Sequence, residues 1–174
     1  VLSTDLVPWA DATVSQMMAQ TKMLMGTVVE YKELMMMYAC AIKEVRTKFD
    51  VLNTEFKIRY QRNPFSSIST RLKRTASITD KLERQNFPFS LESIEKNVND
   101  VAGIRVICSY IDDIYTIAEA FLRQDDVTLI AQKDYIAHPK PNGYRSLHLI
   151  ISIPVFFADR KKDMKVEVQI RTIA

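Results

Sequence analysis

The stretch HPKPNGYRSLHLII, residues 138–151, places polar side chains at the start of an otherwise apolar strand. Side chains alternate across a strand, so Tyr144, Ser146 and His148 would share one face, opposite Arg145. An aromatic ring offers a flat surface to a ligand, and an imidazole can hydrogen bond or titrate near neutral pH. A strand that only filled a core would not need this combination.

The last strand-like stretch, residues 165–172, repeats the pattern with charged side chains. Its apolar positions alternate with a polar row made of Lys165, Glu167, Gln169 and Arg171. A carboxylate can accept a proton or hold a metal ion, and the cations beside it can bind an anionic ligand. A solvated sheet face would explain this row alone. The coincidence of two such strands with Asp100 at the start of a third favours a site.

Strands must hold these residues, and four stretches are rich in the side chains that strands favour. They are residues 100–110, 127–133, 144–156 and 165–172. The last two are predicted to form a hairpin joined through ADRKKD, and helical patterns separate the others. Helices interspersed with strands predict a mixed sheet of the α/β or α+β class.

Helical periodicity occupies most of the remaining chain. Apolar residues recur at three- and four-residue steps over about residues 6–61, which predicts one or two amphipathic helices that end at RNPF, residues 62–65. Shorter helices are predicted over residues 77–86, 90–99 and 112–124. Ser77 with Asp80 would start the first of these, and Ser90 would cap the second.

Composition excludes several classes of protein. The 174 residues are 47% hydrophobic and 26% charged, as expected for one globular domain with a helical extension. A net charge of +3 does not suggest a general nucleic-acid binder. The longest apolar run, Leu149 to Ala158, is far shorter than the roughly 20 residues of a membrane-spanning helix. Two cysteines, Cys40 and Cys108, do not suggest a disulfide framework, which favours a reducing cytoplasm.

Four motifs give the chain a family resemblance. The sequence contains, in this order, RLKRTASITDKLER, NDVAGIRVIC, KPNGYRSLHLII and VEVQIRTIA. They are similar to the synthetase domain of the RelA/SpoT family, most closely to its small single-domain alarmone synthetases. The resemblance implies a nucleotidyltransferase-like mixed β-sheet flanked by helices over residues 63–174. It also implies an N-terminal helical region over residues 1–62 that serves packing or oligomerisation.

The activity implied by this resemblance is that of a GTP pyrophosphokinase. Such an enzyme moves the β,γ-diphosphate of ATP to the 3′-hydroxyl of GDP or GTP, giving ppGpp or pppGpp and AMP in stringent-response signalling. Transfer between two polyanions needs a magnesium ion, cations and a carboxylate base. By similarity, Asp100 would hold Mg²⁺, and Glu167 would act as the base or as a second metal contact. Taken alone, each acid would be explained better as a turn or surface residue.

The resemblance also implies an ATP site made of Arg71, Lys73, Ser77, Lys81, Arg84 and Arg105. Arg71 and Arg105 would sandwich the adenine, since guanidinium planes stack on flat rings. Lys81 and Arg84 would share a helical face, although such a face is usually only solvated. Arg105 would point opposite to Asp100 in a regular strand, and Gly103 would permit a bulge or bend that brings both to one site.

The acceptor nucleotide, GDP or GTP, would bind to Lys140, Tyr144, Arg145, His148 and Gln169 by the same resemblance. Tyr144 would stack on the guanine, while Lys140 and His148 would contact phosphates. Gln169 would orient a substrate or Glu167. A lone histidine is more often a hydrogen-bonded core residue, but Tyr144 and Ser146 share the face of His148.

Assembly and extent are further implications of the family. Small synthetases of this kind form homotetramers through terminal helices, and the methionine-rich N-terminal stripe would suit such an interface. Family members usually continue into another helical segment, so the chain is expected to be truncated after Ala174. Long members add a hydrolase domain with His and Asp ligands. The histidines here, His138 and His148, both lie in the synthetase stretch, so no hydrolase activity is expected.

Two alternatives remain open from sequence. The same basic and aromatic sheet face could bind single-stranded RNA, with Tyr144 stacking on a base. RNA binding would not call for Asp100 and Glu167 beside the cations, which ranks it below the enzyme. The other alternative is a transferase on the same scaffold with a different acceptor. No membrane partner is expected.

Overall fold

The computed structural model describes the backbone of residues 8–173 and the side chains at positions 14, 16–18 and 26–173. The chain forms two compact units, Val1–Met35 and Met36–Ala174. Helix α1 (Pro8–Arg59) is a single helix that ends before RNPF, as predicted. The predicted start at Leu6 lies outside the described residues. The functional division between residues 62 and 63 stays a prediction.

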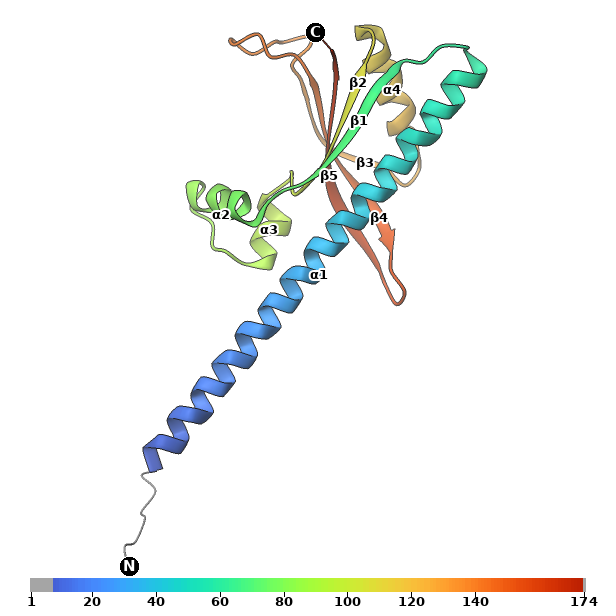
Figure 1. Ribbon diagram of the computed structural model, residues 1–174. Helices are drawn as coiled ribbons and strands as arrows, with labels where there is room; N and C mark the ends of the chain where they lie inside the picture. Colours follow the sequence, from blue (N-terminus) through green and yellow to red (C-terminus); the bar gives the residue numbers. More distant parts are fainter. Residues whose placement is uncertain (1–7, 174) are drawn as a thin grey trace, which may run out of the picture. The chain divides into compact units, whose positions relative to one another are not determined.

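The second unit is built on a five-stranded sheet in the order β1-β2-β5-β4-β3 (Figure 1). Its strands are β1 (Phe65–Leu72), β2 (Ala102–Cys108), β3 (Thr128–Asp134), β4 (Leu147–Phe156) and β5 (Lys161–Thr172). β2 and β5 run parallel, and every other neighbouring pair is antiparallel. This arrangement confirms the predicted mixed sheet and the predicted hairpin between β4 and β5.

The predicted strands differ from the structure by one omission and one wrong boundary. β1 was not predicted, because FSSISTRL is rich in serine and threonine and buries only Phe65 fully. The strand predicted from Tyr144 begins instead at Leu147. Gly143 adopts a left-handed φ of 84°, and its N–H donates to the Lys140 carbonyl at 2.8 Å, so the preceding residues turn rather than extend. Tyr144, Arg145 and Ser146 therefore belong to a loop.

One face of the sheet is covered by helices and forms the core. The alternating residues of β2, β4 and β5 that point to this face are buried. Helix α4 (Ile111–Leu122) and the part of α1 after Met36 meet there, where the rings of Phe49 and Phe121 stack with centroids 4.6 Å apart. Both rings are fully buried. Apolar burial on this face is the main stabilisation of the sheet.

Two short helices precede β2 and lie apart from α4 (Figure 1). Helix α3 (Leu91–Asn97) is capped as predicted, because the Ser90 hydroxyl accepts from the Ser93 N–H at 3.1 Å. Helix α2 (Thr75–Arg84) begins two residues before Ser77, with Arg74 at its N-cap and no side-chain cap. The predicted Ser77–Asp80 start is therefore wrong: burial of Ile78 and Leu82 positions this helix instead.

The other side of the sheet, called the open face here, is polar. Strand register aligns one row across all five strands: Ser69, Arg105, Gln169, His148 and Lys133. The neighbouring row consists of Arg71, Gly103, Glu167, Ile150 and Ala131. Residues in register share a face, so strands far apart in sequence bring their polar side chains together here.

Candidate active site

Asp100 is the centre of a cluster of cations at the start of β2. Its two carboxylate oxygens accept from Lys81 at 2.8 Å and Lys73 at 3.0 Å, and Arg71 lies 3.7 Å away. Burial alone would raise the pKa of Asp100, but the hydrogen bonds and charges of Lys81 and Lys73 outweigh it and lower the pKa. Asp100 is therefore an ionised carboxylate, and its side chain is 14% exposed.

This cluster joins three of the predicted ATP-binding cations from two elements. Arg71 comes from the end of β1, and Lys81 from α2, while Lys73 lies between them. The Lys73 N–H also donates to the Val101 carbonyl at 2.7 Å, which ties this segment to the start of β2. Ser77 and Arg84 are exposed on α2, and no described contact joins them to Asp100. Their predicted role stays a prediction.

Arg105, Gln169 and Glu167 form a connected chain on the open face. Gln169 accepts from Arg105 Nε at 3.4 Å and donates to Glu167 Oε1 at 2.6 Å. Arg71 and Arg105 line one small cavity of about 120 Å³ together with Glu167 and Gln169. Gln169 thus holds the Glu167 carboxylate beside both arginines.

The bulge that Gly103 would permit does not form. β2 pairs in regular register through Gly103, which lies opposite Arg71 on β1 and Glu167 on β5. Asp100 lies in a turn before β2, so the alternation of the strand does not fix the direction of its side chain. Arg71 contacts Asp100 and lines the same cavity as Arg105. A missing side chain at Gly103, rather than a bend, leaves space between these groups.

Tyr144 and His148 lie together at the edge of the open face. The Tyr144 hydroxyl is 2.8 Å from His148 Nε2, and the two ring centroids are 5.7 Å apart. Tyr135 packs edge-on against both rings. The Lys140 ammonium lies 4.6 Å from the Tyr135 ring centroid and 5.3 Å from that of Tyr144. The tyrosine rings can stack on a nucleobase, and the lysine ammonium beside them can bind a phosphate.

The surroundings of His148 favour its neutral form. Burial lowers its pKa most, Glu167 raises it, and the charges of Lys140, Lys133 and Arg105 lower it again, so that the net shift is downward. A neutral imidazole can donate through one nitrogen and accept through the other. Ser146, expected on the same face, is buried and donates to the Ile170 carbonyl at 3.3 Å.

Arg145 and Gln169, the remaining predicted acceptor residues, lie on different parts of this region. Arg145 lines a cavity of about 510 Å³ together with Tyr144, Gly143 and Arg171. Gln169 lies in the row between Arg105 and His148. The cavity is open enough for a nucleotide-sized ligand, and two arginines give it affinity for anions.

Sequence reasoning missed two neighbours of the site. Tyr135 follows β3 directly, and Lys133 pairs in register with His148. Neither belongs to a motif quoted above. Lys133 ends the strand predicted over residues 127–133, but only the register of β3 against β4 places it beside His148.

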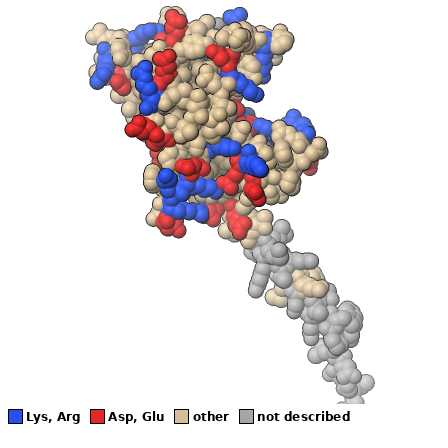
Figure 2. All heavy atoms as spheres, turned by 180° about the vertical axis from the view of Figure 1, so that it is seen from behind, with Lys and Arg blue, Asp and Glu red and all other residues tan. Residues whose placement is uncertain are grey.

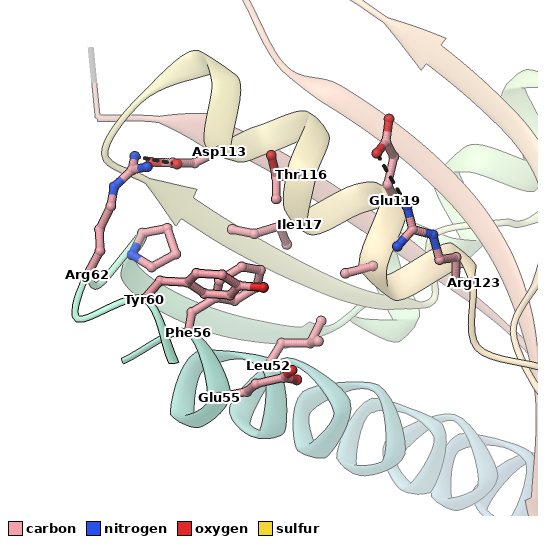
Figure 3. A pocket seen from close by; sticks show the side chains of 12 residues that line it. Leu52, Glu55, Phe56, Tyr60, Arg62, Asp113, Thr116, Ile117, Glu119 and Arg123 are labelled. Carbon is pink, nitrogen blue, oxygen red and sulfur yellow. Dashed lines mark hydrogen bonds and ion pairs between the residues drawn. The ribbon is translucent and has the colours of Figure 1, made fainter. Parts of the chain in front are cut away.

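Other regions of the described molecule do not gather the predicted site residues. A cavity of about 460 Å³ lies between α1 and α4, with Leu52, Phe56 and Ile117 on its apolar wall (Figure 3). Its rim carries the ion pairs Arg62–Asp113 and Arg123–Glu119. On the face drawn in Figure 2, cationic and anionic side chains are interspersed rather than gathered by sign. No helix in the described part of the chain could cross a membrane.

Comparison with known proteins gives the family. Residues 70–174 match a family profile described as a region found in RelA/SpoT proteins. GTP pyrophosphokinase YwaC of Bacillus subtilis is 40% identical over 149 residues, which cover 85% of this chain and 71% of the relative. GTP pyrophosphokinase YjbM of the same organism is 34% identical over 145 residues, covering 83% and 67%.

Solved structures agree with this match. The small alarmone synthetase 2 from Bacillus subtilis superposes with a TM-score of 0.73 at 38% identity, covering 82% of this chain and 72% of that chain. The small alarmone synthetase 1 from the same organism, bound to its product pppGpp, gives a TM-score of 0.75 at 33% identity, covering 83% and 73%. These relatives give no support to the RNA-binding alternative. With well over half of its length matched, the chain belongs to the RelA/SpoT family.

Proposed function

We propose that the protein is a (p)ppGpp synthetase that transfers the β,γ-diphosphate of ATP to the 3′-hydroxyl of GDP or GTP. The single observation that carries the proposal is the arginine-lined cavity on the open face, where Gln169 binds Glu167 and Arg71 also contacts Asp100. Membership of the RelA/SpoT family and the similarity to named GTP pyrophosphokinases support it.

Glu167 is the proposed base. The 3′-oxygen of the acceptor attacks the β-phosphorus of ATP, the bond from that phosphorus to the α,β-bridging oxygen breaks, and AMP leaves. The hydroxyl proton passes to the Glu167 carboxylate. Gln169 donates to one oxygen of Glu167 at 2.6 Å, which fixes the direction of the carboxylate and leaves its other oxygen for the proton.

Lys73, Lys81, Arg71 and Arg105 are proposed to bind the donor nucleotide. Phosphate oxygens would draw the lysines from Asp100, since cations that pair with one carboxylate can instead neutralise a polyphosphate. Arg71 and Arg105 come from neighbouring strands and line one cavity, which supports the proposed adenine sandwich.

Asp100 is proposed to hold Mg²⁺, and the alternative role for Glu167 is a second contact to this ion in place of the role of base. The fit is favourable because Mg²⁺ is usually bound through one or two carboxylates and substrate phosphates, and Asp100 is ionised and bonded to lysines that phosphates can attract. Bound there, the ion would offset the negative charge of the phosphates during transfer. Among the described residues, no three His, Cys, Asp or Glu side chains gather into a protein-only metal site.

The acceptor is proposed to lie against Tyr144, with Lys140 and His148 beside its phosphates. Lys140 lies over the tyrosine ring, so an incoming guanine would take its place on the ring while the ammonium moves to a phosphate. Arg145 lines the adjoining cavity.

The test is to incubate the protein with ATP, Mg²⁺ and GDP or GTP and to separate the nucleotides by anion exchange. Formation of ppGpp or pppGpp together with an equal amount of AMP is expected. Asp100→Asn should remove both products, while Asp112→Asn, an exposed aspartate in α4, should not change them. AMP without a guanosine tetra- or pentaphosphate would contradict the proposal.

We also propose a cytoplasmic homotetramer formed through α1. This helix exposes the apolar side chains Val28, Val29, Met36, Val51 and Ile58. The free thiols of Cys40 and Cys108 suit a reducing compartment. Sedimentation of the protein as a monomer alone at micromolar concentration would contradict the tetramer.

A further inference from the structure

Residues 135–146, called the acceptor loop here, are fastened at their base by one aspartate. Asp134, the last residue of β3, accepts from the N–H groups of Ile136 at 2.9 Å and Ala137 at 3.0 Å through Oδ1. Its Oδ2 accepts from the Tyr115 hydroxyl of α4 at 2.8 Å. One carboxylate therefore closes the first turn of the loop and joins that turn to a helix of the core.

The acceptor loop carries the groups proposed to hold the guanine nucleotide. Tyr144 lies near its far end and Lys140 in its middle, and the Lys140 N–H donates to the Tyr144 carbonyl at 3.2 Å. The cavity beside Tyr144 is bounded by the loop, by Ile111 and Ile114 of α4, and by the end of β5. The width of this cavity thus depends on how the loop lies against α4.

We propose that Tyr115 and Asp134 are positioning residues that hold the acceptor loop against α4 and so set the affinity for the guanine nucleotide. The proposal rests on the proposed synthetase function. Neither residue lines the cavity, and their effect passes through the loop to Tyr144. The proposed donor site uses Arg71, Lys73 and Lys81, which lie outside the acceptor loop and α4. Loss of this hydrogen bond should therefore weaken binding of the guanine nucleotide and leave ATP binding unchanged.

Ionisation favours the bond between the two residues. Burial acts to raise the pKa of Asp134, but the N–H of Ala137, the Tyr115 hydroxyl, the N–H of Ile136 and nearby His138 outweigh it and lower the pKa. Burial and the Asp134 carboxylate raise the pKa of Tyr115. At neutral pH the pair therefore consists of a hydroxyl donor and a charged acceptor, a stronger bond than one between neutral groups.

The test compares Tyr115→Phe with Tyr110→Phe, a matched change at an exposed tyrosine next to α4. Tyr115→Phe should raise the KM for GDP about tenfold, the factor expected for one hydrogen bond to a charged group, and leave the KM for ATP and the thermal midpoint nearly unchanged. Tyr110→Phe should change none of these. An unchanged KM for GDP, or an equal rise for both substrates, would overturn the proposal.

A second measurement uses the protein without nucleotides, so it does not depend on activity. Amide hydrogen exchange at Ile136 and Ala137 should be several-fold faster in Tyr115→Phe, because the loop opens more often. If the wild-type protein makes no guanosine tetraphosphate, the proposed function fails, but faster exchange still supports the attachment of the loop. Exchange equal to that of the wild type would overturn the attachment, whatever the activity.

Asp134→Ala completes the comparison. If both residues act through one bond, Tyr115→Phe should add nothing to the GDP effect of Asp134→Ala. Fully additive effects would show that the two side chains act separately and would overturn their assignment as one positioning pair.

Discussion

At the level of a single residue, replacement of Glu167 should slow diphosphate transfer without preventing nucleotide binding. Glu167→Gln keeps the shape of the side chain and the partner Gln169, but the amide cannot take a proton from the acceptor. We expect transfer to fall by a factor of about 100 or more, while both nucleotides still bind. Rates measured beside calorimetric titration of each nucleotide test this. Glu119→Gln, at an exposed position, is the control, and near-normal turnover of Glu167→Gln would remove Glu167 as the base.

Tyr144 should affect one substrate only. Tyr144→Ala removes the stacking surface and should weaken the guanine nucleotide by about 1–3 kcal/mol, with ATP affinity unchanged. Tyr144→Phe keeps the ring but loses the hydroxyl near His148, so it should retain most of the guanine affinity. Titrations of each variant with GDP and with a non-reacting ATP analogue measure both effects. Equal losses for the two nucleotides would indicate a folding defect instead of a stacking role.

Prediction from sequence reached part of this residue-level picture: alternation along β5 puts Glu167 and Gln169 on one face, whereas Tyr144 meets His148 from the loop before β4 and not from the strand. It placed Glu167 with Gln169 and Tyr144 near His148, and the structure brings each pair together. Lys133 and Tyr135 were missed, because their position depends on the register of β3 against β4 and on the path of a loop. Local periodicity does not determine the register between strands that are distant in sequence.

Among the secondary-structure elements, β2 allows a test of whether ATP binds in the cavity beside Gly103. Gly103 pairs regularly, and a Cβ added there would meet only the Arg71 carbonyl, at an ordinary contact distance of 3.7 Å. Valine suits a strand, so Gly103→Val should fold with unchanged or slightly higher stability. Its side chain would occupy the space between Arg71 and Glu167 and should weaken ATP binding about tenfold or more. Gly103→Ala should weaken it less. Full ATP affinity in Gly103→Val would show that adenine binds elsewhere.

Helix packing on the covered face offers a test of stability. Phe121 of α4 is fully buried and stacks on Phe49 of α1. Phe121→Ala should lower the free energy of unfolding by about 3–5 kcal/mol, measured by urea denaturation, because it leaves a cavity between helices and sheet. Phe156→Ala removes a ring that is 76% exposed and should change stability by less than about 0.5 kcal/mol. Similar losses in both variants would contradict this account of the core.

The errors in predicting elements have physical causes. β1 is an edge strand that pairs only with β2, so it needs few apolar side chains and shows little alternation. Helix α2 starts without a side-chain cap, so the serine that resembled a cap was misleading. The signal at Ser90 was correct because its hydroxyl does accept from the Ser93 N–H. The ends of α4 were predicted to within two residues, whereas β5 begins at Lys161, inside the segment predicted to connect the hairpin, instead of at Lys165.

In the compact unit as a whole, one face of the sheet provides stability and the opposite face carries the proposed site. Apolar side chains on one face pack against α1 and α4, while the other face brings charged groups from β1, β2, β3 and β5 into neighbouring rows. Substitutions on the open face can therefore change nucleotide binding without removing core contacts. The acceptor loop is the exception, since Asp134 joins it to a helix of the covered face.

The most direct test of the central claim is to follow two labels through one reaction. The protein is given GDP, Mg²⁺ and ATP labelled either at the α- or at the γ-phosphate, and the products are separated by thin-layer chromatography. The account predicts that the γ-label appears in guanosine tetraphosphate while the α-label stays in AMP. Release of the γ-label as inorganic phosphate or pyrophosphate, with GDP unchanged, would contradict diphosphate transfer on the open face.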